Sequence, residues 1–91
     1  MRTVQIQCAG RVQGVFFRKY ATEQAQALGL PGWVKNQMDG SVLIQVAGNH
    51  EQIEAFIRWC HQGSPLSVVE KVMFQEVANV KDLPYPFQIR Y

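Results

Sequence analysis

Hydrophobic and polar residues alternate along the first segment of the chain, over residues 3–8. The apolar positions of this segment are Val4, Ile6 and Cys8. A period of two predicts a strand with one buried face. Residues 18–28 are instead rich in helix-forming residues, with apolar side chains at helical spacing and Gly29 as a stop signal. They predict a helix.

Three later segments have the character of strands. Residues 32–36 and 41–47 flank an Asp-Gly pair that is typical of hairpin turns, and the second of these segments alternates apolar and polar residues. Residues 68–77 predict a fourth strand. After a proline-containing loop, the final FQIRY alternates in the manner of a short edge strand.

A second helix is predicted between the hairpin and the fourth strand. Asn49 is a favourable N-cap, Gln52 stands three residues later in the capping-box position, and Gly63 ends the segment. Apolar residues at the spacing i, i+3, i+4 and i+7 predict one buried face, formed by Ile53, Phe56, Ile57 and Cys60.

The order of elements is therefore βαββαβ with a short C-terminal strand. This order predicts an α+β fold of the ferredoxin-like, split βαβ type, with two helices on one face of a mainly antiparallel sheet. With 91 residues the chain has room for one hydrophobic core, so we expect a single domain over residues 1–91. The right-handed crossover makes the first two strands parallel, with the third between them.

The composition of the chain reduces the range of functions to be considered. The formal net charge of +2 is too small to favour nonspecific binding to nucleic acid or membrane, and no apolar run has the length of a signal or membrane-spanning segment. Cys8 and Cys60 lack the spacing of a metal or redox motif, so we expect two buried, reduced thiols and a cytoplasmic protein. No long exposed apolar stripe is evident, and we expect a monomer.

The segment GRVQGVFFR, residues 10–18, directly follows the first strand and leads into the first helix. Its glycines at 10 and 14 allow the backbone to turn inward, so that successive N–H groups form an anion-binding nest. Arg18 stands where the helix N-terminus also favours an anion. The topology brings this loop and Asn36 to one sheet edge, about 10 Å apart.

These residues resemble the two signatures of the acylphosphatase family. The first signature is matched by Gly10, Val12, Gln13, Gly14, Val15, Phe17 and Arg18. The second is matched by Gly32, Trp33, Val34, Lys35, Asn36, Gly40, Val42 and Gly48. The tail FQIRY is also similar to the family's ending. Cys8 departs from the family pattern, which has an aliphatic residue there, and this affects packing rather than chemistry.

The resemblance implies an enzyme that hydrolyses small acyl phosphates to a carboxylate and inorganic phosphate, without a metal, a cofactor or a covalent intermediate. Arg18 would bind the phosphate and Asn36 would orient the attacking water. Backbone N–H groups would hold the other phosphate oxygens, and they belong to Gln13, Gly14, Val15, Phe16, Phe17 and Arg18. A loose phosphoryl-transfer transition state asks mainly for such positioning and charge neutralisation.

Simpler interpretations of the same residues remain. Arg18 alone is compatible with a solvated residue in a first helical turn, and Asn36 with a residue that favours the hairpin turn. Phe16 and Phe17 are expected to anchor the loop, Phe17 in the core. His50 and His61 are expected at the surface or at helix ends, because no second pair of ligands stands at metal spacing.

The topology also allows two contacts between distant parts of the chain. Cys8 and Cys60 both point inward near the same sheet edge, and whether their thiols touch stays open. If the last strand runs beside the second, the carboxylate after Tyr91 ends near Arg18 and is placed to orient it.

A binding module of the same fold is the main alternative function. An RNA-binding domain would display aromatic side chains on the open face of its central strands, where this chain has Gln5, Gln7, Ser41, Leu43 and Gln45. A regulatory small-ligand domain, or part of a larger carbamoyl-transferring enzyme, is harder to exclude. The acyl group also stays open, because acetyl phosphate, carbamoyl phosphate and 1,3-bisphosphoglycerate share one anhydride.

Overall fold

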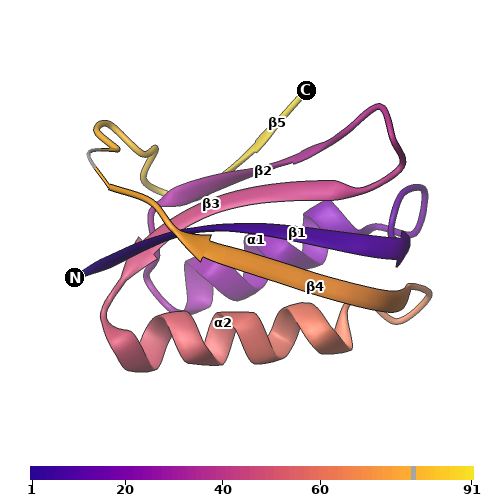
Figure 1. Ribbon diagram of the computed structural model, residues 1–91, viewed down its shortest axis with the longest axis horizontal. Coiled ribbons are helices and arrows are strands. Elements are labelled where there is room, and N and C mark those ends of the chain that lie inside the picture. Colours follow the sequence, from indigo (N-terminus) through magenta and orange to yellow (C-terminus); the bar gives the residue numbers. More distant parts are fainter. Residues whose placement is uncertain (79) are drawn as a thin grey trace.

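The computed structural model describes residues 1–78 and 80–91. Its elements follow the predicted order: β1 (Arg2–Arg11), α1 (Phe17–Ala27), β2 (Gly32–Asn36), β3 (Val42–Gly48), α2 (His50–Gln62), β4 (Val68–Glu76) and β5 (Gln88–Arg90). Figure 1 shows these elements in a two-layer arrangement. Among the described residues, no helix is both long and apolar enough to span a membrane.

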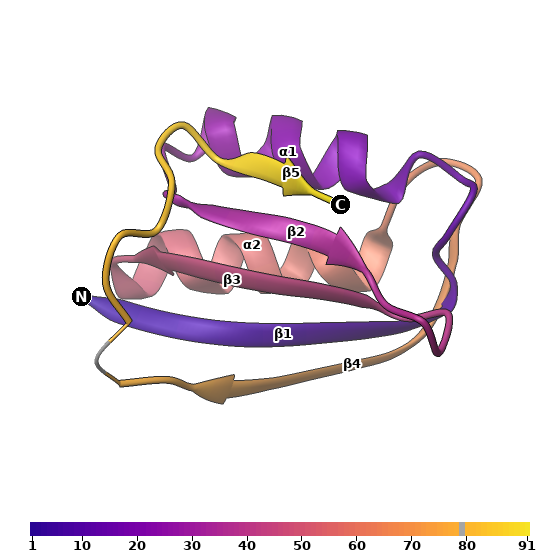
Figure 2. The same ribbon diagram turned by 90° about the horizontal axis from the view of Figure 1, so that it is seen from above.

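The sheet has the strand order β4-β1-β3-β2-β5. β3 is antiparallel to both β1 and β2, so β1 and β2 run in the same direction with β3 between them, as predicted. β4 pairs antiparallel with β1, and β5 pairs parallel with β2. Both helices cover one face of this mixed sheet (Figure 2), and the ferredoxin-like α+β fold is confirmed.

The core lies between this sheet face and the two helices. The predicted inward residues of β1 are fully buried, as are Ala21 and Ala25 of α1 and the predicted apolar face of α2, apart from the slightly exposed Ile57. Cys8 and Cys60 are free, buried thiols, as expected. Burial raises the pKa of the Cys60 thiol, and its hydrogen bond with Cys8 raises it further. The effect of Cys8 on this pKa indicates that the two thiols, whose contact the sequence leaves open, are neighbours in the core.

β1 is longer than the alternation predicts and continues past residue 8 to Arg11. Its pairing with β4 shifts register between Ala9 and Gly10, which marks a bulge. Gly10 has φ 123°, and a Cβ at this position would overlap the carbonyl oxygen of Val68. The first glycine of the motif thus serves the close approach of β4 rather than the turn, which leaves Gly14 (φ 74°) as the glycine of the loop itself.

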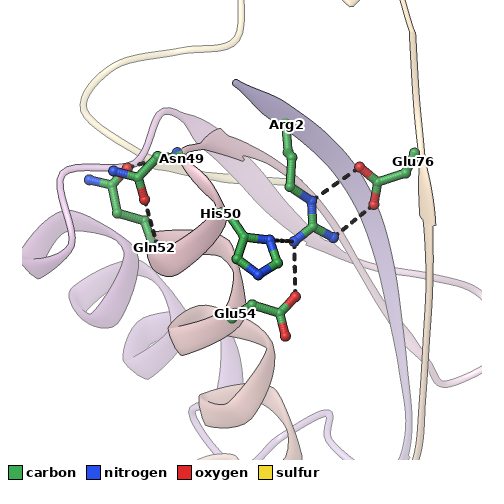
Figure 3. Close-up of polar contacts among 6 residues, drawn as sticks. All are labelled: Arg2, Asn49, His50, Gln52, Glu54 and Glu76. Carbon is green, nitrogen blue, oxygen red and sulfur yellow. Dashed lines mark hydrogen bonds and ion pairs between the residues drawn. The ribbon is translucent and has the colours of Figure 1, made fainter.

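The N-terminus of α2 lies at the end of the sheet where β1 begins, and its backbone is closed by side chains (Figure 3). The Asn49 side chain accepts from the Gln52 N–H, and the Gln52 side chain accepts from the Asn49 N–H, so the predicted capping box is confirmed.

Arg2 is the centre of a charged cluster at this same end (Figure 3). Its guanidinium donates to both carboxylate oxygens of Glu76, at 3.2 and 2.9 Å, and to Glu54 at 2.9 Å. A contact of 3.1 Å joins it to the ring nitrogen Nδ1 of His50. These contacts hold the pKa of both carboxyl groups below their usual value. The arginine connects the edge strand β4 to helix α2 through β1.

Candidate active site

A pocket opens at the other end of the sheet, where β1 and β2 end and α1 begins. Its volume is about 270 Å³, and the described residues that line it are Val12, Gly14, Phe16, Phe17, Arg18, Lys19, Asn36 and Ile89. Figure 2 shows how the loop after β1, the start of α1 and the turn between β2 and β3 gather at this end. The topology therefore brings Arg18 and Asn36 into one pocket, although they come from different elements.

The backbone of residues 12–16, called here the anion loop, supplies one wall. Gly14 has φ 74°, and Phe16 has φ 63° and ψ 22°. Left-handed residues alternating along a loop turn successive N–H groups toward one point, which is the geometry of an anion-binding nest. The two left-handed residues of the loop are compatible with the predicted nest, and one of them is a phenylalanine at a position that glycine or asparagine adopts more easily.

The N-terminus of α1 adds further donors. The N–H of Tyr20 is bonded to the Phe16 carbonyl at 3.1 Å, so the N–H groups of Phe17, Arg18 and Lys19 precede the first N–H that is bonded within the helix. Phe16 provides no side-chain cap, and the first turn contains no acidic residue. The positive end of the helix dipole is therefore open to an anion.

Arg18 lines the pocket and has no carboxylate partner among the described residues. Among residues 1–78 and 80–91, the ion pairs found all involve Arg2 and none involves Arg18. Instead, the Arg18 guanidinium carbon lies 5.0 Å from the centre of the Tyr91 ring. The predicted approach of the C-terminal residue is therefore present, but the aromatic ring makes the contact and the expected carboxylate pair is not formed. A ring holds the guanidinium by cation–π attraction and leaves its N–H donors free.

Asn36 ends β2, where it pairs in register with Val42 of β3. Its side-chain oxygen Oδ1 is buried and has no hydrogen-bond partner among the described atoms. Buried polar atoms in native proteins are nearly always bonded, so an orphaned acceptor on a residue that lines a pocket is unusual and singles out the Asn36 amide.

Gln13 ties the anion loop to the β2–β3 turn. Its Nε2 donates to the backbone oxygens of Gln37 and Ser41, at 2.8 and 2.9 Å. Asp39 stabilises that turn by accepting from the Ser41 hydroxyl and N–H, and both bonds hold the pKa of Asp39 below its usual value. The Gln13 side chain is therefore committed to structure, and only its backbone remains for binding.

The two phenylalanines of the motif have different environments. Phe17 is buried, and its ring centroid lies 5.2 Å from that of Trp59, so it anchors the start of α1 as predicted. Phe16 is 65% exposed. The prediction that Phe16 also anchors the loop is wrong, because its side chain lies at the surface instead of packing in the core.

Sequence reasoning missed other residues around the pocket. Lys19 follows Arg18 directly, and its position in the first helical turn was a usable signal. Ile89 reaches the pocket because β5 lies parallel to β2, and the alternation of FQIRY with the predicted pairing was sufficient to place it. Across the described part of the chain, no three His, Cys, Asp or Glu side chains form a group suited to a metal ion.

The open face of the sheet carries the polar side chains predicted for it. Gln45 donates to Gln5 at 3.0 Å, and Gln7 donates to the Ser41 hydroxyl at 3.1 Å. Trp33, which pairs in register with Gln45, is only 7% exposed because Lys35 and Arg90 lie over its ring. These contacts leave little aromatic surface for stacking RNA bases on this part of the face.

The fold is ferredoxin-like, and a pocket lined by Arg18 and Lys19 lies at the start of its first helix. The Acylphosphatase family profile matches residues 4–89. An acylphosphatase of Nocardioides sp. is 49% identical over 69 residues, which are 76% of this chain and 70% of that protein. The chain belongs to the acylphosphatase family of hydrolases.

Solved structures agree with this assignment. The crystal structure of acylphosphatase from Bacillus subtilis covers all of both chains with a TM-score of 0.94 and 35% identity. The chain also matches a segment of full-length HypF, solved in a phosphate- and nucleotide-bound form, with a TM-score of 0.84 and 34% identity. That match covers 99% of this chain and 12% of HypF.

Proposed function

We propose that the pocket between the anion loop and Asn36 binds a small acyl phosphate and hydrolyses it to a carboxylate and inorganic phosphate. The observation that carries this proposal is the buried, unpartnered Oδ1 of Asn36 in the same pocket as Arg18. The Asn36 amide lacks a donor and the Arg18 guanidinium lacks a carboxylate partner among the described residues. A water molecule would pair with the first group and a phosphate with the second.

Arg18 and the backbone bind the phosphoryl group. The guanidinium is a planar fork that matches two phosphate oxygens, and the Tyr91 ring leaves its donors free. The N–H groups of residues 13–18, from Gln13 through Gly14, Val15, Phe16 and Phe17 to Arg18, surround the remaining oxygens. Donors fixed before the substrate arrives stabilise the transition-state charge at little reorganisation cost.

Asn36 orients the nucleophile. Its Oδ1 accepts a hydrogen bond from a water molecule, which directs a lone pair of the water oxygen toward phosphorus. The water oxygen forms the new bond to phosphorus, and the bond between phosphorus and the acyl oxygen breaks. The carboxylate leaves with the electron pair of that bond. Because a carboxylate is a good leaving group, positioning and charge neutralisation meet most of the chemical demand.

We also propose that residues 1–91 act as a single domain, as a monomer and in the cytoplasm, with acyl phosphate and inorganic phosphate as small-molecule partners. The two free, buried cysteines suit a reducing compartment. Light scattering on the purified protein tests the monomer.

Hydrolysis of benzoyl phosphate in the presence of a chelator tests the mechanism. Arg18→Ala and Asn36→Ala are expected to lower kcat/KM by at least about a hundredfold each, because each removes a group fixed for the transition state. Arg58→Ala is the matched control, since Arg58 is exposed on α2 and outside the lining of the pocket. Circular dichroism verifies that each variant is folded. Near wild-type activity in either pocket variant would contradict the proposal, and loss of wild-type activity on chelation would contradict its metal independence.

A further inference from the structure

Ser64, in the loop between α2 and β4, is hydrogen-bonded to the anion loop and lies outside the lining of the substrate pocket. Its hydroxyl donates a hydrogen bond of 2.7 Å to the backbone carbonyl of Val15, and both residues are buried. Ser64 is not among the described residues that line the pocket. We infer that Ser64 is a positioning residue, which aims the Phe16 N–H at the phosphate by holding the Val15 carbonyl.

The geometry of one peptide unit connects the two groups. A trans peptide points its C=O and its N–H in opposite directions. The Val15 carbonyl and the Phe16 N–H belong to the same unit, so the bond to Ser64 turns the N–H away from Ser64. Gly14, Phe16 and Arg18 line the pocket and Ser64 does not, so in this inference an N–H that is directed away from Ser64 lies on the pocket side of the loop.

Phe16 makes this hydrogen bond necessary. Its φ of 63° is a strained conformation for a phenylalanine. Relaxation of this angle to a negative value requires the plane of the peptide between Val15 and Phe16 to rotate. That rotation breaks the bond to Ser64 and turns the Phe16 N–H out of the pocket. Strain of this kind persists only where the surroundings hold it in place, and Ser64 supplies such a restraint.

Ser64 is itself held rigidly. Its carbonyl accepts hydrogen bonds from the N–H of Ser67 at 3.0 Å and from the Ser67 hydroxyl at 2.8 Å. The serine is 3% exposed, so solvent cannot easily replace its hydroxyl as the partner of Val15. The Gln13 side chain fixes the other end of the anion loop to the β2–β3 turn. The loop is therefore anchored on both flanks, and Ser64 is the anchor at the strained residue.

The experiment compares Ser64→Ala with Ser67→Ala as the control. Ser67→Ala removes a hydroxyl bond in the same loop but keeps the bond from the Ser67 N–H to the Ser64 carbonyl, so the Ser64 hydroxyl still reaches Val15. The probe is inorganic phosphate, titrated by calorimetry, with KM and kcat measured on benzoyl phosphate. Ser64→Ala is expected to weaken phosphate binding and raise KM by roughly tenfold each, since it loosens a hydrogen bond to a charged group. Ser67→Ala is expected to change either value by less than about twofold. Equal effects of the two variants would overturn the inference.

A second background separates positioning from general loosening of the fold. Glycine adopts a positive φ without strain, so in a Phe16→Gly background the loss caused by Ser64→Ala is expected to shrink to roughly threefold or less. A loss of the same size in both backgrounds would overturn the inference. If Ser64→Ala does not fold, the wild type decides: the Phe16 amide resonance must shift when phosphate is added, and an unmoved resonance rejects the inference.

The inference rests on the proposed phosphate site, so Arg18→Ala is titrated in the same series. Phosphate binding that survives Arg18→Ala unchanged rejects the site itself. Loss of binding in Arg18→Ala together with unchanged binding in Ser64→Ala rejects only the role of Ser64.

Discussion

The N-termini of the two helices lie at opposite ends of the sheet and are treated in opposite ways (Figure 2). The N-terminus of α2 is closed by the Asn49–Gln52 capping box and has Glu51 in its first turn. The N-terminus of α1 has no side-chain cap and no acidic residue, and it begins from a left-handed Phe16. One helix satisfies its own polar groups, whereas the other leaves them available.

The two arginines at these ends repeat the contrast. Arg2 is enclosed by the carboxylates of Glu54 and Glu76 (Figure 3), while Arg18 has an aromatic ring beside it and no carboxylate among the described residues. Polar groups that a fold leaves unpaired reduce its stability, so their concentration at one end argues for a ligand there. The difference separates an arginine with carboxylate partners from the arginine that we propose binds phosphate.

Replacing each arginine by lysine tests this contrast, and the largest effect is expected on the activity of the Arg18 variant. Arg18→Lys keeps the charge but loses the fork that matches two phosphate oxygens, and kcat/KM for benzoyl phosphate is expected to fall by about a hundredfold. Arg2→Lys is expected to leave kcat/KM within about twofold of wild type, because exposed ion pairs contribute little even to stability.

Steady-state kinetics on both variants, with thermal melts to verify folding, provide the measurement. An Arg18→Lys enzyme within threefold of wild type would show that charge alone suffices, and the fork argument would be wrong. A large activity loss in Arg2→Lys would show that the two ends are coupled.

Removal of the α2 cap has a smaller expected effect, on stability alone. Asn49→Ala deletes the side chain that accepts from the Gln52 N–H, and the free energy of unfolding is expected to fall by about 1 kcal/mol. Urea denaturation measures this change. Activity in native buffer is expected to stay at the wild-type level, since α1, not α2, borders the pocket. Unchanged stability would mean that the cap contributes nothing beyond what water supplies.

Local sequence signals predicted most of the fold correctly. The alternation of Val4, Ile6 and Cys8, and the capping box at Asn49 with Gln52, are confirmed because each depends on neighbours within a few residues. The pocket residues Arg18 and Asn36 were also identified from the sequence, through motif context and the parallel direction of β1 and β2. Their proposed roles stay predictions until the variants are measured.

The sequence could not predict which individual groups form hydrogen bonds or contacts between distant parts of the chain. Ser64 meets Val15 across 49 positions of sequence, and no periodicity marks a loop serine as the partner of a particular carbonyl. The error on Phe16 has a related cause: hydrophobicity predicts burial, whereas this phenylalanine has a left-handed backbone and an exposed side chain. Likewise, we expected from the sequence that Arg18 meets the C-terminal carboxylate of Tyr91, whereas the Tyr91 ring makes the contact.

The smallest expected effect is a loss of stability in acid, where the contacts of Arg2 with Glu54 and Glu76 weaken. The hydrogen bonds of Glu54 and Glu76 to Arg2 lower the pKa of both carboxyl groups below the ordinary value of 4.5. A lowered pKa means that the native state binds these protons less readily than the unfolded state does, so the stabilisation is complete above pH 4.5 and is lost as the pH falls through the lowered values.

Urea unfolding at pH 6 and at pH 3.5 measures the loss in wild type and in Arg2→Gln. The variant is expected to lose less stability between the two pH values, because its carboxylates have no guanidinium to release, while Asp39 titrates equally in both proteins. Identical losses would show that the cluster in Figure 3 is too well solvated to influence stability, and the contrast between the two ends would then rest on Arg18 alone.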